Sequence, residues 1–149
     1  AIFLSRLLNG HQPVVFEDGG QLRDFVSIHD VVSCLVLMLE QDGTDYLPVN
    51  VGSGKRVRIV EIAQTLAKLL GDSVDPQITN QGRQFDIRHN TADITRAREQ
   101  LGYIPKVSLD DGMAELIEWA RTSPDGAVDF FDQALSELER KGLLVEPKV

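Results

Sequence analysis

One apolar segment constrains the fold of this chain more than any other. Residues 31–39 are hydrophobic except for Ser33, and Glu40 follows them. Asp30 stands just before this run and can cap a helix from Val31 to about Glu40. A helix that is apolar nearly all round has no face suited to water, so we expect it to be buried on more than one side. The run is too short to span a bilayer, and we expect no membrane association.

The rest of the sequence alternates short strands with helices. Apolar residues at helical spacing, often closed by glycine, predict helices at residues 1–9, 59–70, 93–101, from 108 to before Pro124, and about 127–141. β-favourable runs predict strands at residues 13–16, 23–28, 47–51 and 76–79. Glycines and acids at 17–20 favour a hairpin between the first two strands, and residues 80–91 read as a polar loop. The pattern predicts a mixed α/β fold with a small sheet.

The charge of the protein limits the partners it can have. Its 15 Lys and Arg against 23 Asp and Glu give a formal net charge of −8. An acidic chain without a basic stripe argues against nucleic acid as a ligand. Cys34 is the only cysteine among the 149 residues, so no intramolecular disulfide can form, and its apolar setting predicts a buried thiol. A single thiol without a secretion signal leads us to expect a cytoplasmic protein.

Three arginines stand out within this acidic chain. Arg23 lies in the second predicted strand, whereas Arg83 and Arg88 lie in the polar loop. A guanidinium group binds phosphate through two parallel hydrogen bonds, so two arginines from distant segments could clamp a diphosphate. The alternative is that each arginine pairs with a nearby acid, Arg23 with Asp24 or Arg88 with Asp86.

Several familiar motifs are incomplete. The Gly52-Ser53-Gly54-Lys55 stretch lacks the first glycine and the final Ser or Thr of a phosphate loop, and it lacks the third glycine of a dinucleotide fingerprint. It is better interpreted as a tight turn. The three histidines are too far apart to predict a metal site, and none is expected. His29 beside Asp30 could be an acid-base pair, although a structural role is the more common one.

Four segments taken together resemble extended short-chain dehydrogenase/reductases that act on nucleotide sugars. The resemblance spans residues 1 to about 121. It rests on residues 16–32, which include Gln21-Leu22-Arg23-Asp24-Phe25; on Val49-Asn50-Val51-Gly52-Ser53-Gly54; on residues 86–105, which include Asp86-Ile87-Arg88-His89; and on residues 108–119. The family's glycine-rich motif and its catalytic Tyr-x-x-x-Lys are not found. The resemblance therefore implies the C-terminal, substrate-binding half without the N-terminal Rossmann half, and no catalytic or cofactor-binding residue is assigned here.

The same resemblance implies roles for eight residues. Arg23 and Arg83 would hold the diphosphate of a nucleotide sugar, and Asp86 would accept a hydrogen bond from the ribose. Arg88 would contact phosphate or brace the loop, and Asn90 would face the sugar. The apolar residues assigned to the base pocket and to packing behind Arg23 are Val14, Phe16 and Phe25. Residues 1–123 would form the substrate-binding domain, and residues 124–149 a C-terminal helical extension.

The implied function is substrate binding in an NAD-dependent nucleotide-sugar 4-epimerase that acts on a dTDP-deoxyhexose or a UDP-hexose. The alternatives are a 4,6-dehydratase and a non-catalytic nucleotide-binding or interaction module. The expected partners are the nucleotide sugar, the N-terminal half and a second copy in a homodimer. One departure concerns the loop: Gln84-Phe85 stands where the family often has Pro-Gly, so we expect a less tightly turned backbone after Arg83.

Overall fold

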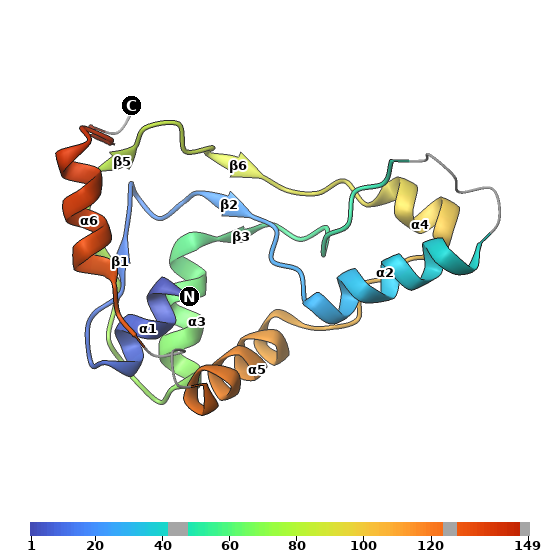
Figure 1. Ribbon diagram of the computed structural model, residues 1–149, viewed down its shortest axis with the longest axis horizontal. Coiled ribbons are helices and arrows are strands. Elements are labelled where there is room, and N and C mark those ends of the chain that lie inside the picture. Colours follow the sequence, from blue (N-terminus) through green and yellow to red (C-terminus); the bar gives the residue numbers. More distant parts are fainter. Residues whose placement is uncertain (42–47, 124–127, 147–149) are drawn as a thin grey trace. The chain divides into compact units, whose positions relative to one another are not determined.

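A computed structural model of the chain describes residues 1–41, 48–123 and 128–146. The chain divides into two compact units, each built from separate stretches of sequence (Figure 1). The first unit takes Ala1–Gln21, Arg58–Arg88 and Met113–Val149, and the second takes Leu22–Val57 and His89–Gly112. Helices and short, paired strands occur in both, which confirms the α/β class.

The first unit is organised around two helices and a parallel strand pair. Helix α1 (Ile2–Leu8) packs on α3 (Ile59–Leu69), and α3 packs on strand β1 (Val14–Val15). Strand β1 pairs in parallel with β4 (Gln77–Ile78). The apolar faces of these elements supply its buried side chains, which include Leu4, Leu7, Val15, Ile62, Ala63 and Leu66. The periodicity expected for residues 59–70 is therefore confirmed along most of that helix.

The hairpin expected at residues 13–28 is wrong. Strand β2 (Leu22–Arg23) lies between β3 (Val57–Arg58) and β6 (His89–Asn90) in a three-stranded sheet, whereas β1 pairs with β4. The carbonyls of Pro13 and Val15 accept hydrogen bonds from the amides of Gln77 and Thr79, at 2.8 and 3.0 Å. Strand β1 thus satisfies its backbone groups with a distant segment, and local turn chemistry does not decide its partner.

The core of the second unit forms where α2 (Ile28–Glu40) packs on α4 (Thr95–Leu101). Its buried residues are Cys34, Ile94, Ala97, Leu101 and Tyr103, with Val49 and Val51 packed against them. The Cys34 side chain is fully buried, as the sequence predicts, and this burial raises the pKa of its thiol. Residues 48–51 are not part of a strand, so the strand expected at 47–51 is not found in the described residues.

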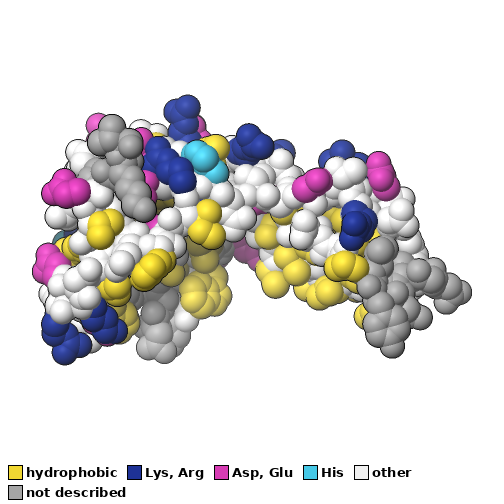
Figure 2. Space-filling model, turned by 90° about the horizontal axis from the view of Figure 1, so that it is seen from above, with side chains coloured by type: hydrophobic (Ala, Val, Ile, Leu, Met, Phe, Trp, Pro, Cys, Tyr) yellow, Lys and Arg dark blue, Asp and Glu magenta, His cyan; other side chains and the backbone are white. Residues whose placement is uncertain are grey.

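Helix α2 differs from the prediction at its start and on its surface. Ser27, rather than Asp30, is the N-cap, and its hydroxyl accepts a hydrogen bond from the amide of His29 at 3.2 Å. The helix exposes a stripe of apolar side chains, each between 43% and 87% accessible: Ile28, Val32, Leu35, Val36 and Leu39. Hydrophobic side chains that reach the surface are yellow in Figure 2. Within the described residues, the expected burial on more than one side is therefore wrong.

The C-terminal segment adds two helices and a strand to this framework. Helix α5 (Leu109–Thr122) begins after Ser108, whose hydroxyl accepts from the amide of Asp111 at 3.1 Å, so the predicted start of this helix is confirmed. Helix α6 (Phe131–Arg140) is followed by β7 (Leu144–Val145), which pairs antiparallel with β5 (Gly82–Arg83). Pro124 and Ala127, at the expected helix break, lie outside the described residues.

The inner face of α6 largely follows the sequence pattern. Phe131 is buried, and Leu135 and Leu138 are half-buried. Phe130, the residue just before the helix, is 63% exposed. In the part of the chain that is described, no helix combines the length and apolar character needed to cross a membrane.

Candidate functional site

The eight predicted site residues divide between the two units. Arg23, Phe25 and Asn90 belong to the second unit, and the others belong to the first: Val14, Phe16, Arg83, Asp86 and Arg88. Each unit contains a cavity that two of these residues line, Phe16 and Arg83 in the first unit and Arg23 and Asn90 in the second.

The arginine loop contains a tight turn between Arg83 and Asp86. The amide of Asp86 donates to the carbonyl of Arg83 at 3.1 Å, which closes a four-residue turn. Phe85, the third residue, has φ of 68°, a conformation that type II turns require and glycine normally supplies. The expectation of a looser backbone is therefore wrong, because Phe85 adopts the conformation of the missing glycine.

Replacing Phe85 with glycine is expected to stabilise the protein by about 1 kcal/mol, because a left-handed conformation costs a non-glycine residue roughly 1–2 kcal/mol. The Phe85 side chain is 86% exposed, so its removal gives up little burial. Urea unfolding followed by circular dichroism measures the difference. Phe85→Ala retains a β-carbon and serves as the control that should not gain this stability. An unchanged or lower midpoint for Phe85→Gly would show that the turn is not strained.

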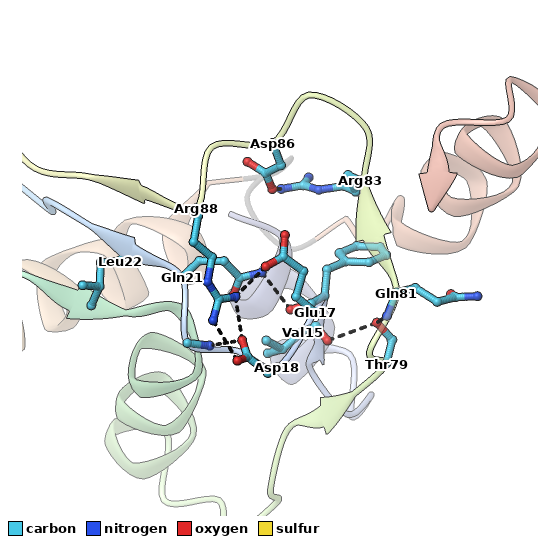
Figure 3. A network of polar contacts seen from close by, with 12 residues as sticks. Val15, Glu17, Asp18, Gln21, Leu22, Thr79, Gln81, Arg83, Asp86 and Arg88 are labelled. Atoms are coloured by element: carbon cyan, nitrogen blue, oxygen red, sulfur yellow. Dashed lines mark hydrogen bonds and ion pairs between the residues drawn. The ribbon is translucent and has the colours of Figure 1, made fainter. Parts of the chain in front are cut away.

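Arg83 and Phe16 lie together at an apolar cavity of the first unit. The guanidinium carbon of Arg83 is 5.3 Å from the centroid of the Phe16 ring, a cation-π distance. Arg83 Nη2 also donates to Asp86 Oδ2 at 2.7 Å (Figure 3). The cavity measures about 240 Å³, and both Phe16 and Arg83 line it. Val14 is buried in β1. An aromatic wall beside a cation is an arrangement that can hold a ring with an attached anion.

Arg88 braces a turn of the first unit. Its two terminal nitrogens reach the two oxygens of Asp18, each at 2.7 Å, and Nη1 also contacts Glu17 (Figure 3). This hydrogen bonding holds the pKa of Asp18 well below its usual range. Glu17 has φ of 52°, so the pairing also anchors a residue in an unfavourable conformation. Of the two roles left open for Arg88, the geometry favours bracing.

Gln21 is a buried polar residue bonded to Phe16 that the sequence analysis did not assign to the site. Its side chain is buried, and Nε2 donates to the carbonyl of Phe16 at 2.9 Å. Its Oε1 has no hydrogen-bond partner among the described residues. Gln21 therefore positions the backbone of Phe16 and offers one buried acceptor beside it. Its place in the Gln21-Leu22-Arg23 segment was the signal available in the sequence.

The second unit holds a larger and more polar cavity. Strand register places Arg23 directly opposite Asn90 on the parallel strands β2 and β6. Both residues line a cavity of about 460 Å³, together with Asp24, Val49, Asn50, Val51, Thr91 and Ala92. Arg23 Nη1 donates to the carbonyl of Leu22 at 2.9 Å. Phe25, two positions after Arg23 in the sequence, is half-buried. Its packing behind Arg23 stays a prediction.

Asp24 holds the walls of this second cavity together. Its carboxylate accepts hydrogen bonds from the Ser53 amide at 2.8 Å, the Ser53 hydroxyl at 2.6 Å, the Gly54 amide at 2.9 Å and the Ala92 amide at 3.3 Å. Gly52 lies so close that an added β-carbon would be 2.6 Å from the Ala92 β-carbon. The amides of the 52–54 turn therefore bind a carboxylate of the protein itself, which supports its interpretation as a structural turn.

Two further buried polar residues organise the second unit. Asp30 accepts hydrogen bonds from the amides of Lys106 at 2.8 Å and Val107 at 3.1 Å. The Tyr103 hydroxyl donates to the carbonyl of Gly52 at 2.9 Å, and burial raises the pKa of Tyr103 to about 12. Both carboxylate oxygens of Asp30 thus serve the backbone, which favours a structural role over acid-base chemistry with His29.

The fold and its arginine-lined cavities define a small α/β domain of the extended short-chain dehydrogenase/reductase class. The family model described as GDP-mannose 4,6 dehydratase matches residues 2–116. The chain belongs to this family of NAD-dependent epimerases and dehydratases.

Curated relatives are similar over most of this chain. A dTDP-L-rhamnose 4-epimerase from Burkholderia thailandensis is 34% identical over 105 residues, covering 70% of the chain and 29% of the relative. A UDP-glucose 4-epimerase from Mycolicibacterium smegmatis is 36% identical over 121 residues, covering 81% of the chain and 38% of the relative. The chain thus spans about a third of the length of these relatives.

Solved structures of nucleotide-sugar epimerases are also similar to this chain. The UDP-glucose 4-epimerase of Thermotoga maritima with UDP-glucose superposes with a TM-score of 0.73 at 33% identity, covering 80% of this chain and 38% of that one. The UDP-glucuronic acid 4-epimerase of Bacillus cereus, in complex with UDP-glucuronic acid and NAD, gives a TM-score of 0.68 at 29% identity, covering 75% and 36%.

Proposed function

We propose that this chain is the substrate-binding portion of an NAD-dependent nucleotide-sugar 4-epimerase. One observation carries the proposal: each arginine that the resemblance assigns to the diphosphate lines a cavity, Arg83 in the first unit and Arg23 in the second. Residues 1–123 form the substrate-binding domain in this proposal, and residues 124–149 are the extension. The substrate is a dTDP-deoxyhexose or a UDP-hexose, which the names of the relatives support.

The chemistry of the two arginines suits this task. Guanidinium stays charged at any physiological pH and forms paired hydrogen bonds to phosphate oxygens. Binding energy from the nucleotide, remote from the reacting carbon, can then serve to orient the sugar. In this proposal Asp86, which accepts a hydrogen bond from Arg83, also accepts one from the ribose, and Asn90 beside Arg23 faces the sugar.

NAD supplies the hydride chemistry in this proposal, and the residues described here do not form its site. The turn that comes closest to a phosphate cradle, Gly52-Ser53-Gly54, already directs two amides at Asp24. We therefore place the cofactor mainly in an N-terminal Rossmann half, and we propose that the isolated chain is catalytically inactive. The chain's own contribution is to bind and orient the nucleotide sugar.

Two alternatives follow from particular observations. The description of the family model favours a 4,6-dehydratase that uses the same substrate-binding residues. The second alternative is a nucleotide-binding or interaction module without catalysis, for which the same arginine-lined cavities are sufficient. Binding of a nucleoside diphosphate is common to all three functions, whereas turnover separates the module from the enzymes.

Arg23→Ala and Arg83→Ala are each expected to weaken the binding of UDP and dTDP at least tenfold, because a charge-assisted bond to phosphate contributes about 1.5–3 kcal/mol. Isothermal titration calorimetry measures this loss. Arg98→Ala removes an exposed cation of α4 and is the matched control, which should bind like the parent chain. Binding that all three variants retain equally would refute the assignment.

An NADH absorbance assay with the chain alone should show no turnover, and measurable turnover would contradict the proposed inactivity.

The exposed stripe of α2 is proposed to be covered by the N-terminal half of the family fold. Its members at Ile28, Val32, Leu35, Val36 and Leu39 share one helix face. Exposed apolar surface of this kind marks an interface. Leu35→Glu is expected to reduce self-association of the isolated chain in light scattering, with exposed Glu118→Gln as the control. A parent chain that is monomeric at all concentrations would show that the stripe does not drive association. Homodimerisation of the whole protein is a further proposal, which light scattering of a longer protein tests.

A further inference from the structure

The segment that follows α5 lies outside the region matched by the family model, yet it contacts the candidate site. The family match ends at residue 116, whereas α6 and β7 lie beyond it. Strand β7 pairs with β5, so that Leu144 stands opposite Arg83 and Val145 opposite Gly82. An additional β-carbon on Gly82 would lie 3.3 Å from Val145, which shows how closely the two strands approach. The strand that carries Arg83 is thus paired to the extension.

Four side-chain contacts hold the start of α6 beside other residues of the first unit. The Phe131 ring lies 6.4 Å from the Phe16 ring, centroid to centroid, in a tilted arrangement. The guanidinium carbon of Arg6 lies 4.4 Å from the centroid of the Phe131 ring. Asp129 accepts from Arg6 at 3.4 Å and contacts His11 Nδ1 at 2.9 Å. Packing, cation-π and ionic contacts therefore place the helix beside Phe16.

The cavity beside Phe16 is consequently built from two sources. Phe16 and Arg83 come from the region that the family model matches, and the remaining wall comes largely from the extension. The residues of the extension that line it are Phe131, Ala134, Leu135, Glu137, Leu138, Lys141 and Leu143. At about 240 Å³ the cavity is smaller than the roughly 300–1,000 Å³ of pockets for drug-sized ligands, so it suits one ring system.

We propose that the C-terminal extension forms one wall of the base pocket and acts as its specificity-determining element. This inference rests on the proposed nucleotide-sugar function and assigns to the extension the part of the ligand that distinguishes one nucleotide from another. The occupant is a pyrimidine ring. Phe16 offers it an aromatic face and α6 an aliphatic one. Arg83 supplies a cation that can attract an attached phosphate, whereas Lys141 is paired with Glu137 at 2.6 Å.

The test is a substitution within the extension that makes the cavity smaller and leaves Phe16 and Arg83 unchanged. Ala134→Trp places a large ring at the cavity wall and is expected to weaken the binding of UDP and dTDP at least tenfold in calorimetry. Gln133→Trp adds the same ring at the neighbouring exposed position, which does not line the cavity, and should bind as the parent chain does. Thermal unfolding verifies that each variant is folded. Leu135→Phe, a smaller change at the same wall, takes the place of Ala134→Trp if that variant does not fold.

The outcomes separate this inference from the function on which it rests. If Ala134→Trp binds like the parent chain while Arg83→Ala does not bind, the extension has no part in the base pocket and the nucleotide-sugar function stands. If the parent chain binds neither UDP nor dTDP, both proposals are overturned. Selective loss in Ala134→Trp, with Gln133→Trp unaffected, supports the inference.

Discussion

Asp24→Ala is expected to lower the free energy of unfolding by about 3 kcal/mol, because bonds to a charged acceptor contribute about 1.5–3 kcal/mol each before solvent screening is considered. The variant removes the acceptor of three amides and one hydroxyl around the second cavity. Those donors belong to two segments, Ser53–Gly54 and Ala92, which no longer share a common partner. Urea unfolding followed by circular dichroism measures the loss.

Asp75→Ala is the matched control, because the Asp75 side chain is exposed and forms no hydrogen bond or ion pair with another described residue. Asp24→Asn preserves the size of the side chain and removes its charge, so it should fall between the parent chain and Asp24→Ala. Equal stability of Asp24→Ala and Asp75→Ala would show that this carboxylate does not organise the cavity.

Gly52→Ala is expected to have a comparable effect, a loss of about 3 kcal/mol, since overpacking of a close contact typically costs about 1–3 kcal/mol. The new β-carbon would lie 2.6 Å from both the Ala92 β-carbon and Asp24 Oδ2. The change therefore pushes apart the same two segments that Asp24 draws together. The same urea titration measures it, and the shape of the second cavity should change with it.

Gly112→Ala provides the opposite expectation. An added β-carbon there would contact only Val107 Cγ1, at an ordinary 3.8 Å. Gly112 lies within α5, where alanine is preferred over glycine by about 1 kcal/mol, so this variant should be as stable as the parent or more stable. A parallel loss in both variants would mean that close approach is not what requires glycine at position 52.

Helices and buried apolar residues followed from local patterns. The helix at 59–70, with Ile62 and Leu66 buried, and the helix start at Ser108 are confirmed because each depends on residues three or four positions apart. The buried state of Cys34 is confirmed for a related reason, since an apolar run surrounds it in the sequence.

Features that depend on distant partners could not be predicted in this way. The partner of β1 is β4, which no turn signal links to it. The exposed stripe of α2 looks in sequence like any buried helix face, because sequence records apolar character and not what covers it. The tight turn at Phe85 was not predicted for another reason. Tertiary structure can impose a positive φ on a residue that disfavours it.

The contacts of the predicted site residues also depend on partners that local sequence patterns do not reveal. The family resemblance named Arg23, Asn90, Arg83 and Asp86, but it did not predict that Arg23 stands opposite Asn90 or that Arg83 pairs with Asp86. The acids that hold Arg88, Glu17 and Asp18, are about 70 positions away in the sequence. No local rule reaches that distance.

Neither unit of this protein is a continuous stretch of sequence, since the chain passes between them after Gln21, Val57, Arg88 and Gly112. A single recombination event therefore cannot exchange one whole unit between related genes. A chimaera with one crossover would combine part of each unit from one parent protein with the rest from the other. Such chimaeras should rarely fold unless the cores of the two parents have similar packing. Substitution within an intact framework is accordingly the easier evolutionary path to a new ligand preference.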